Sequence, residues 1–362
     1  MVFVSLSMDF TNLSIYYAVD PVRSLTARPM STGSFSYERE IAVEAVRQAA
    51  RLCVAVQQQL AAAAIEKEDR TPVTIADFGS QALIARMLRS AFPTDAIMAE
   101  EDAATLRDPA NEALAKQLNS FVRQIHPGAT IDQVCNWIDY GNLAEYRDRF
   151  WTIDPIDGTK GFLRGDQYAV ALALLVDGKP RVAALACPNL PHVWENDADR
   201  GWIFVAEEGE GAIRQPIDPS IERPQQTPIG VSTTRAPEEA RFCESVVSEH
   251  SSHDTAQKVA DMLGITEEPL RVDSQCKYAI VARGEAEIYM RLPRPGTTYV
   301  ERIWDHAAGA LIMTEAGGQV TDLDGRALDF TQGMRLEQNR GILATNAHLH
   351  DDLLQALRRA RA

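Results

Sequence analysis

Cysteine is scarce in this chain and long apolar runs are missing, and both shortages narrow the classes of protein to consider. No hydrophobic run approaches the roughly 18 residues that a membrane-spanning helix needs, so we expect no membrane segment. The five cysteines are odd in number and scattered, without Cys-x-x-Cys spacing. This pattern argues against a disulfide framework or a zinc site and favours reduced thiols inside a cell. We therefore expect a soluble, cytoplasmic protein.

Positive charge is also in short supply. The formal net charge is −15 and the pI is about 5.0, so the surface field repels nucleic-acid backbones and anionic lipids. We expect no nucleic-acid or membrane partner. An anionic small molecule would have to meet a local positive site supplied by metal ions, a helix N-terminus or a few Lys and Arg side chains. The sequence gives no sign of an obligate partner chain, and we expect a monomer.

The first 34 residues differ in composition from the rest of the chain. They are rich in Ser and Thr, and the stretch PVRSLTARPMSTGSF contains two Arg and no acid. A mitochondrial or plastid targeting segment has this character, but Asp9 and Asp20 weigh against it and Met30 is an alternative start. We expect residues 1–34 to be a disordered extension, with a targeting segment as the alternative.

Hydrophobic periodicity predicts an N-terminal α+β lobe over residues 35–228. Apolar residues recur every three or four positions from Ile41 to Leu60, and again across VTIADFGSQALIARMLRSAFP, which predicts two amphipathic helices. Short strands are expected at AIMA and FWTID, with a helix-prone surface insertion at residues 103–149 between them. Apolar runs on both sides of Asp177-Gly178 predict a β-hairpin.

A Pro-rich stretch near residue 228 predicts a boundary, after which residues 229–362 form a C-terminal α/β lobe. Helical patterns near 238–248 and 255–263 alternate there with β-rich runs, and DHAAGALIMTEAGG reads as a final helix that begins at Asp305. With 362 residues, of which 45% are hydrophobic, the chain is long enough for two lobes. The predicted class is an α/β (α+β) layered sandwich.

The strongest functional signal is the pair of acids in WTIDPIDGTKGFLRGD. Asp154 and Asp157 follow an apolar strand, where two unpaired carboxylates would lose solvent and repel each other unless a cation lay between them. The carbonyl of Ile156 adds a third oxygen, and oxygen-only ligation favours a hard ion such as Mg²⁺. Gly158 and Thr159 then open a helix, whose free N–H groups form a site for phosphate. An ordinary turn with a helix cap is the alternative interpretation of this stretch.

Three further acids stand where the chain could bring them to the same place. Glu100 ends the AIMA strand, Asp69 lies in the loop between the first two helices, and Asp305 begins the last predicted helix. For Asp305 a plain N-cap role competes with metal ligation. Glu101, Asp102 and the acids of residues 103–149 are interpreted as solvated surface charge.

Taken together, DPIDGTKGF, TPVTIADFGSQALI, AEED and IWDHAAGALIMTEAGG resemble the Mg²⁺-dependent, lithium-inhibited inositol monophosphatase and fructose-bisphosphatase superfamily. The resemblance runs from about residue 36 to the C-terminus and implies an αβαβα fold. Within the superfamily, EHSSHD and DSQCKYAIVARGEAEIYMRLP look like the 3'(2'),5'-bisphosphate nucleotidases. These enzymes hydrolyse 3'-phosphoadenosine 5'-phosphate to AMP and phosphate.

The resemblance implies a role for individual residues, with two or three Mg²⁺ ions as cofactor. Its metal ligands correspond to Glu100, Asp154, the Ile156 carbonyl, Asp157 and Asp305. Water activation falls to Asp69, with Thr159 orienting the water. The positions that line the substrate and its 5'-phosphate correspond to Gly158, Thr159, His250, Ser274, Lys277, Tyr289 and Arg291.

Two alternatives stay open at this point. One is an inositol phosphate phosphatase that uses the same chemistry, and the other is a catalytically silent sensor of nucleotide or metal. The substrate-lining positions also have plainer interpretations, since Tyr289 and Arg291 alternate along a strand that could face solvent. His250 lies in a polar loop where a free histidine is common.

Overall fold

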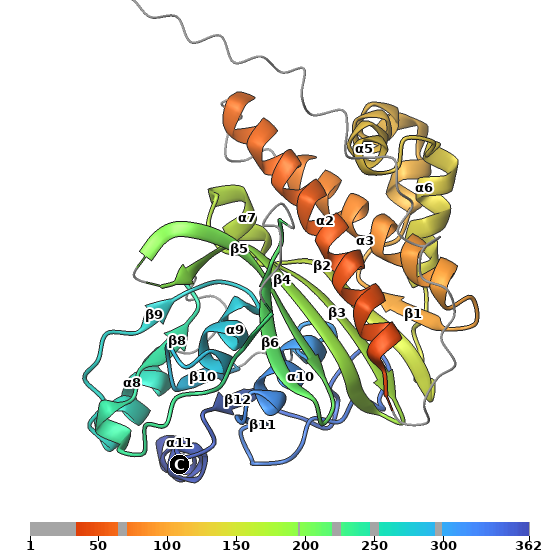
Figure 1. Cartoon of the computed structure of the whole chain (residues 1–362). Helices are drawn as coiled ribbons and strands as arrows, with labels where there is room; N and C mark the ends of the chain where they lie inside the picture. The colour runs from red at the N-terminus through yellow and green to blue at the C-terminus, as the bar shows by residue number, and fades with distance from the viewer. Residues whose placement is uncertain are drawn as a thin grey trace, which may run out of the picture. The chain divides into compact units, whose positions relative to one another are not determined.

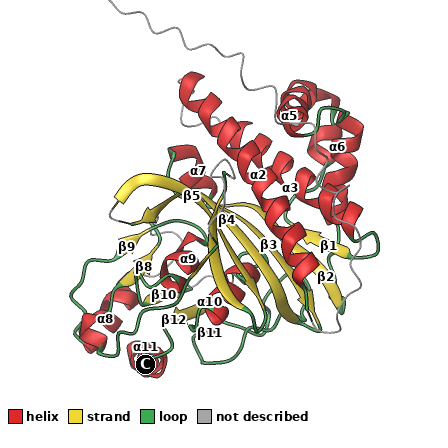
Figure 2. Ribbon diagram, in the orientation of Figure 1, coloured by secondary structure: helices red, strands yellow, loops and turns green. Residues whose placement is uncertain are grey.

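Helices and sheets of this chain alternate in five layers, as Figures 1 and 2 show. The computed structural model describes residues 34–63, 71–194, 196–218, 226–246, 253–293 and 299–361. The predicted disordered extension or targeting segment at residues 1–34 therefore lies, except for Ser34, outside the described residues. The predicted αβαβα class is confirmed, and residues 35–362 form one compact unit. The proposed division into lobes at residue 228 stays a prediction.

The first layer is a pair of long helices, α2 (Ser36–Ala63) and α3 (Thr71–Ala91). Both were predicted, and α3 ends two residues before Pro93, which cannot continue a helix. The predicted insertion is helical, and it packs on α3 through apolar side chains rather than lying loosely on the surface. Its elements are α4 (Ala104–Arg107), η2 (Pro109–Asn111), α5 (Glu112–Ile125), α6 (Ile131–Ile138) and η3 (Asp139–Gly141).

The second layer is a seven-stranded sheet in the order β1-β2-β3-β4-β5-β6-β7, parallel only between β1 and β2. Asp177 and Gly178 join β3 to β4 with φ values of 52° and 72°, as a tight hairpin turn requires. The predicted hairpin is thus confirmed. The strands are β1 (Ala96–Ala99), β2 (Arg149–Asp157), β3 (Ala169–Val176), β4 (Lys179–Val193), β5 (Asn196–Glu207), β6 (Gly211–Pro216) and β7 (Thr227–Pro228).

Two helices form the middle layer, α9 (Cys276–Ala282) and α10 (Ala307–Glu315), and beyond them lies a five-stranded sheet. Its strand order is β11-β12-β10-β8-β9. The strands are β8 (Phe242–Glu244), β9 (Leu270–Arg271), β10 (Ile288–Arg291), β11 (Gln319–Thr321) and β12 (Ile342–Thr345). The last layer holds α8 (His253–Leu263) and α11 (His350–Ala360), which pack on the far face of this sheet.

The helix predicted near residues 238–248 is wrong. A single 3-10 turn, η4 (Pro237–Glu239), precedes β8 in this stretch. Phe242 and Cys243 pair in parallel with Ile288 and Tyr289 of β10, so burial in a sheet overrides the local helical pattern.

Strand β10 lies between two packed regions, and its residues face one region or the other. Ile288 and Met290 face the core shared with α8 and α11, whereas Tyr289 faces the middle helices. The alternation places Tyr289 and Arg291 on the side of the middle layer. All five cysteines are buried and free of disulfides, as expected. None of the helices in the described ranges is long and apolar enough to cross a membrane.

Candidate active site

A bulge in β2 brings the paired acids to one side of the strand. Asp154 stands opposite Ala171 and Asp157 opposite Ala169, so three steps on β2 match two on β3. In a regular strand, residues three apart point to opposite faces, and the extra residue of a bulge changes that alternation. Asp154, Ile156 and Asp157 accordingly all line the same cavity.

This cavity, of about 1060 Å³, collects most of the residues singled out from the sequence. They come from the ends of β1 and β2, the start of α7 (Thr159–Arg164), α9 and the turn before it, β10, and the turn before α10. The predicted residues that line it are Glu100, Asp154, Ile156, Asp157, Gly158, Thr159, Ser274, Lys277, Tyr289, Arg291 and Asp305. The remaining two, Asp69 and His250, lie outside the described residues.

Backbone geometry at Ser274 fixes one of the carboxylates. Ser274 has φ of 69°, a left-handed conformation that is costly for a residue with a side chain. It lets the backbone N–H of Gln275 donate to Asp157 Oδ2 at 2.6 Å. Gly158 packs so closely here that a Cβ would lie 2.9 Å from Cβ of Ser274, and its own φ of 91° also favours glycine. Asp157 is thus held in a fixed position by the loop that carries Ser274.

Asp154 is the most deeply placed of the acids. Only 2% of it is exposed, and its Oδ1 has no hydrogen-bond partner among the residues that the structure describes. Burial, followed by the charges of Glu100, Asp157 and Asp305, raises the pKa of Asp154 well above its ordinary value. Burial and the neighbouring Asp157 do the same to the pKa of Asp305. A buried, unpartnered carboxylate oxygen facing a cavity is a strong indication of a missing cation.

Glu100 lies at the exposed edge of this cluster. Enough protein surrounds its carboxyl group that desolvation, together with Glu101 and Asp157, raises its pKa to about 7. Four carboxylates from three separate parts of the chain therefore repel one another around a single point. With the Ile156 carbonyl nearby, the donors are all oxygen, and this set fits a hard divalent ion such as Mg²⁺.

The structure corrects the interpretation of Asp305 as a helix cap. Helix α10 begins at Ala307, and its N-cap is His306, which makes no side-chain capping bond. Asp305 precedes the cap in a turn and points into the cavity wall instead. The turn is held close to α9, since a Cβ on Gly309 would lie 2.1 Å from Cδ2 of Tyr278.

Behind Asp305 runs a buried polar network that sequence reasoning missed. Glu301 Oε2 lies 2.8 Å from Arg291 Nε and 3.3 Å from His306 Nε2, and His306 Nδ1 lies 3.0 Å from the Tyr278 hydroxyl. Burial alone would raise the pKa of Glu301, but His306 and Arg291 together lower it to about 2. The letters ERIWDHAAG carried part of the signal, because Glu301 and His306 stand within six positions, whereas Arg291 comes from β10.

The same network bears on metal binding. Ligand atoms of Glu301, Asp305 and His306 lie within 4.8 Å of one another, close enough for one ion to touch all three. Glu301, however, already binds Arg291 and His306. Within the described ranges, Asp305 accepts only a long hydrogen bond from the Tyr299 hydroxyl, at 3.5 Å, and its charge acts on Asp154. We therefore place the candidate metal centre among Glu100, Asp154, Asp157 and Asp305.

Cationic side chains also line the cavity. Lys277 is 3% exposed, and burial lowers the pKa of its ammonium group. Its Nζ donates to the Val272 carbonyl at 3.2 Å and lies 5.3 Å from the centre of the Tyr289 ring. An ammonium has three donors, so two remain for a ligand. Tyr289 is itself buried in the cavity wall, which overturns the interpretation that it faces solvent.

A second acid missed from the sequence is Asp77 in α3. Burial and then Glu101 and Glu100 raise its pKa well above the ordinary value, and its charge in turn acts on Asp154. Glu101, expected at the surface, is half-buried, and its backbone is bound through both N–H and C=O by Gln81. The signal was present in VTIADFGSQ, where Asp77 and Gln81 share one face of the helix at spacing four.

Comparison with known proteins connects this geometry to one family. The sequence pattern of the inositol monophosphatase family matches residues 35–362. A protein of Schizosaccharomyces pombe named 3'(2'),5'-bisphosphate nucleotidase is 40% identical over 341 residues, covering 89% of this chain and 95% of that protein. A protein of the same name from Dictyostelium discoideum is 41% identical over 336 residues, covering 91% and 99%.

Solved structures agree on the fold. SuhB of Mycobacterium tuberculosis superimposes with a TM-score of 0.58 at 20% identity, covering 91% of this chain and 98% of that one. An inositol monophosphatase from Anabaena superimposes with a TM-score of 0.56 at 24% identity, covering 90% and 96%. At this level of identity the likeness concerns the arrangement of layers alone.

Replacing Asp154 by Asn tests whether the acids await a cation. In EDTA the change replaces a buried carboxyl group, whose ionised form is disfavoured by burial and by Glu100, Asp157 and Asp305, with a neutral amide, so the variant should melt about 2 °C or more above the parent. Added Mg²⁺ should raise the melting temperature of the parent but not that of the variant. The exposed Asp261→Asn serves as the control for lost charge. A variant that is less stable in EDTA and still stabilised by Mg²⁺ would contradict this assignment.

Proposed function

The chain belongs to the inositol monophosphatase family, and on that premise we propose that it removes the 3'-phosphate from 3'-phosphoadenosine 5'-phosphate. The products are AMP and inorganic phosphate. The choice of a nucleotide substrate follows the names of relatives that are about 40% identical over most of the chain. The enzyme is a phosphoric monoester hydrolase, and we expect the sulfated form of the nucleotide to be a further substrate.

One observation carries the proposal: a buried carboxylate oxygen without a hydrogen-bond partner among the described residues lines a cavity that cationic side chains also line. Asp154 Oδ1 is that oxygen, and Lys277 and Arg291 line the same cavity. A substrate with two phosphate groups on one nucleoside matches a cavity that holds both carboxylates and cations. One phosphate is proposed to meet the metal ligands and the other the lysine.

The carboxylates of Glu100, Asp154, Asp157 and Asp305, with the Ile156 carbonyl, are proposed to hold two or three Mg²⁺ ions. When bound, Mg²⁺ supplies an acidified water and neutralises charge on the phosphoryl and leaving oxygens. The chain's own part is to hold its carboxylates in place before the ion arrives. The N–H of Gln275 does this for Asp157, and the bulge in β2 does it for Asp154.

Thr159 and Gly158 are proposed to receive the phosphate that is cleaved. Both line the cavity directly after Asp157, at the point where β2 gives way to α7. Backbone N–H groups at the start of a helix have no intrahelical partner and can donate hydrogen bonds to an anion. The Thr159 hydroxyl is proposed to orient the attacking water, so that attack comes in line with the departing 3'-oxygen.

An acid must also accept the proton of that water. The sequence resemblance assigned this role to Asp69, which lies outside the described residues. The surroundings of Asp77 in α3 favour this residue, because its charge acts on Asp154 and the charges of Glu101 and Glu100 act on it, so it lies close to the proposed metal ligands. We propose Asp77 as the acceptor and keep Asp69 as the alternative.

Recognition of the 5'-phosphate is proposed to depend on Lys277 more than on Arg291. The charge of Arg291 is balanced by Glu301 at 2.8 Å, whereas Lys277 has only the Val272 carbonyl as a hydrogen-bond acceptor among the described residues. A substrate without this phosphate would leave the buried ammonium unpaired. Ser274 and Tyr289 line the same part of the cavity, and His250 remains a predicted contact.

A substrate panel tests the proposed activity. We expect phosphate release from 3'-phosphoadenosine 5'-phosphate to depend on Mg²⁺, to be inhibited by Li⁺, and to exceed release from inositol 1-phosphate. Asp157→Asn should abolish release while the protein stays folded by circular dichroism, since one of the cation's oxygen ligands becomes neutral. A clear preference for inositol 1-phosphate would establish the inositol phosphatase instead. Nucleotide binding without phosphate release would establish the sensor.

Comparing Asp77→Asn with Asp69→Asn identifies the proton acceptor. Loss of general-base catalysis costs about 10²- to 10⁴-fold in kcat, and we expect this loss for Asp77→Asn alone. Since Asn matches Asp in shape, melting temperatures should stay close to that of the parent for both variants. The larger loss appearing in Asp69→Asn would restore the assignment made from the sequence.

Lys277→Gln tests the contact with the 5'-phosphate. A hydrogen bond to a charged group is worth about 1.5–3 kcal/mol, so kcat/KM for 3'-phosphoadenosine 5'-phosphate should fall about 10- to 100-fold. The value for 3'-AMP, which has no 5'-phosphate, should change little. Lys258→Gln, at an exposed position on α8, is the matched control. Equal losses for both substrates would mean that Lys277 acts on the fold or the metal centre instead.

A further inference from the structure

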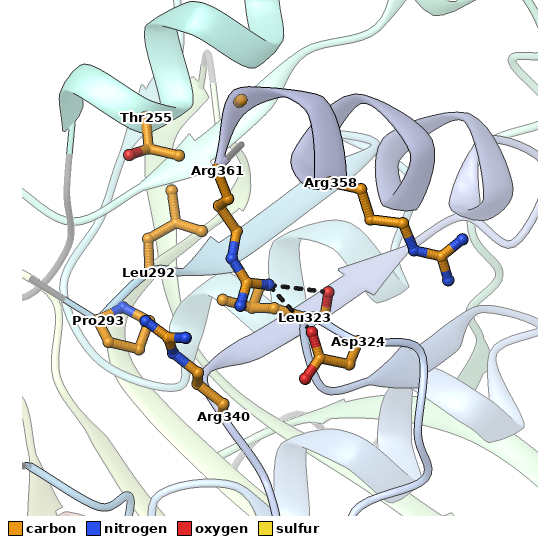
Figure 3. A pocket seen from close by; sticks show the side chains of 9 residues that line it. Thr255, Leu292, Pro293, Leu323, Asp324, Arg340, Arg358 and Arg361 are labelled. Atoms are coloured by element: carbon orange, nitrogen blue, oxygen red, sulfur yellow. Dashed lines mark hydrogen bonds and ion pairs between the residues drawn. The ribbon is translucent and has the colours of Figure 1, made fainter.

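A second cavity, of about 530 Å³, lies outside the active-site cavity on the far side of β10. Figure 3 shows it between the last turn of α11 and the turn that follows β11. Its size falls within the range of small-molecule sites. It is lined by Thr255, Leu292, Pro293, Leu323, Asp324, Arg340, Arg358, Ala360 and Arg361.

The charge of this cavity is opposite to that of the chain. Three guanidinium groups and one carboxylate line it, which leaves a net charge of two positives in a protein of net charge −15. Arg361 Nη1 donates to the Leu323 carbonyl at 3.3 Å and to Asp324 Oδ1 at 3.2 Å, as the dashed lines in Figure 3 mark. These bonds hold Arg361 in place and neutralise part of its charge.

Arg340 and Arg358 have no side-chain partner within the part of the chain that the structure describes. In Figure 3, Arg340 reaches toward Arg361 from the opposite side of the cavity, and Arg358 extends outward at its rim. The helix dipole accounts for basic residues in the last turn of α11, but not for Arg340, which comes from the approach to β12. The helix dipole alone therefore does not explain why three arginines line this cavity.

The remaining lining is mostly apolar. Leu292, Pro293 and Leu323 line the cavity together with Arg340 and Arg361, and Thr255 adds a hydroxyl group. Guanidinium groups bind phosphate in two-pronged fashion and stack on flat rings, and apolar walls accept the face of a nucleobase. A phosphate dianion would match the two net positive charges, and a nucleoside would fill the apolar part.

The two cavities are separate but share one wall. Leu292 and Pro293 are the residues that line both. Next to that wall, a Cβ on Gly341 would lie 2.4 Å from the carbonyl oxygen of Arg291 and 2.9 Å from Cδ of Pro293. The backbone beside Arg340 is thus packed directly against the strand end that carries Arg291 into the active-site cavity.

We propose that this cavity is a second binding site, which takes a nucleoside monophosphate with its phosphate beside Arg340 and Arg361 and with Arg358 at the rim adding positive charge. AMP is the natural probe, and this choice alone rests on the proposed function, where AMP is the product. The site itself does not depend on catalysis. A nucleotide bound there would lie against Leu292 and Pro293, which also line the active-site cavity.

Calorimetric titration of AMP into the protein in EDTA tests the proposal without turnover. The variant is Arg340→Gln with Arg358→Gln, and the control is Arg326→Gln with Arg359→Gln, which removes two equally exposed arginines outside the cavity. Neither pair touches the active-site cavity, so binding there is common to all three proteins. We expect the cavity pair to weaken one AMP site at least about 10-fold and the control pair to leave it unchanged.

Inorganic phosphate and adenosine, titrated separately, should each bind more weakly than AMP. Equal AMP affinity in the parent and both variants would overturn the proposal. An equal loss of AMP affinity in both variants would also overturn it, because that loss would reflect the change in net charge alone. Inorganic phosphate binding as tightly as AMP would overturn the nucleotide assignment. Melting temperatures of both variants verify that they are folded, and phosphate release, measured separately, reports on the proposed function.

Discussion

Mutual repulsion among carboxylates that the fold forces together is the constraint on which this site depends. Asp154, Asp157, Glu100 and Asp305 come from positions separated by up to about half the chain, and burial removes the water that would otherwise separate their charges. Repulsion of this kind lowers stability unless cations compensate. The layered sandwich, the bulge in β2 and the left-handed Ser274 all serve to maintain an arrangement that the side chains alone would avoid.

This constraint also reconciles an acidic protein with an anionic substrate. A field of net charge −15 repels phosphate at long range, so attraction must arise locally. In the proposed function, the acids bind divalent ions, and the ions together with Lys277 would present positive charge to the phosphate groups. Glu301 keeps Arg291 balanced within the same cavity. An acidic protein can thus bind an anionic ligand, because the positive charge of the ions and Lys277 would be confined to this cavity.

Much of this arrangement could be predicted from the sequence, because the signals were local. The two long helices, the Asp177-Gly178 hairpin and the acids around GTKG follow from periodicity and turn chemistry. Other features depend on contacts between distant segments and could not be read locally. The supposed helix near 238–248 contains a strand because β10 is there to pair with it, and Asp305 lies in the turn before its helix, which packs against α9 where Gly309 meets Tyr278.

The most direct measurement is anomalous diffraction from crystals soaked in Mn²⁺, a close substitute for Mg²⁺ with a strong anomalous signal. The account predicts peaks within bonding distance of Asp154, Asp157 and Glu100 or Asp305, in the cavity that Lys277 also lines. Peaks confined to other parts of the surface, or no peak beside Asp154, would contradict it.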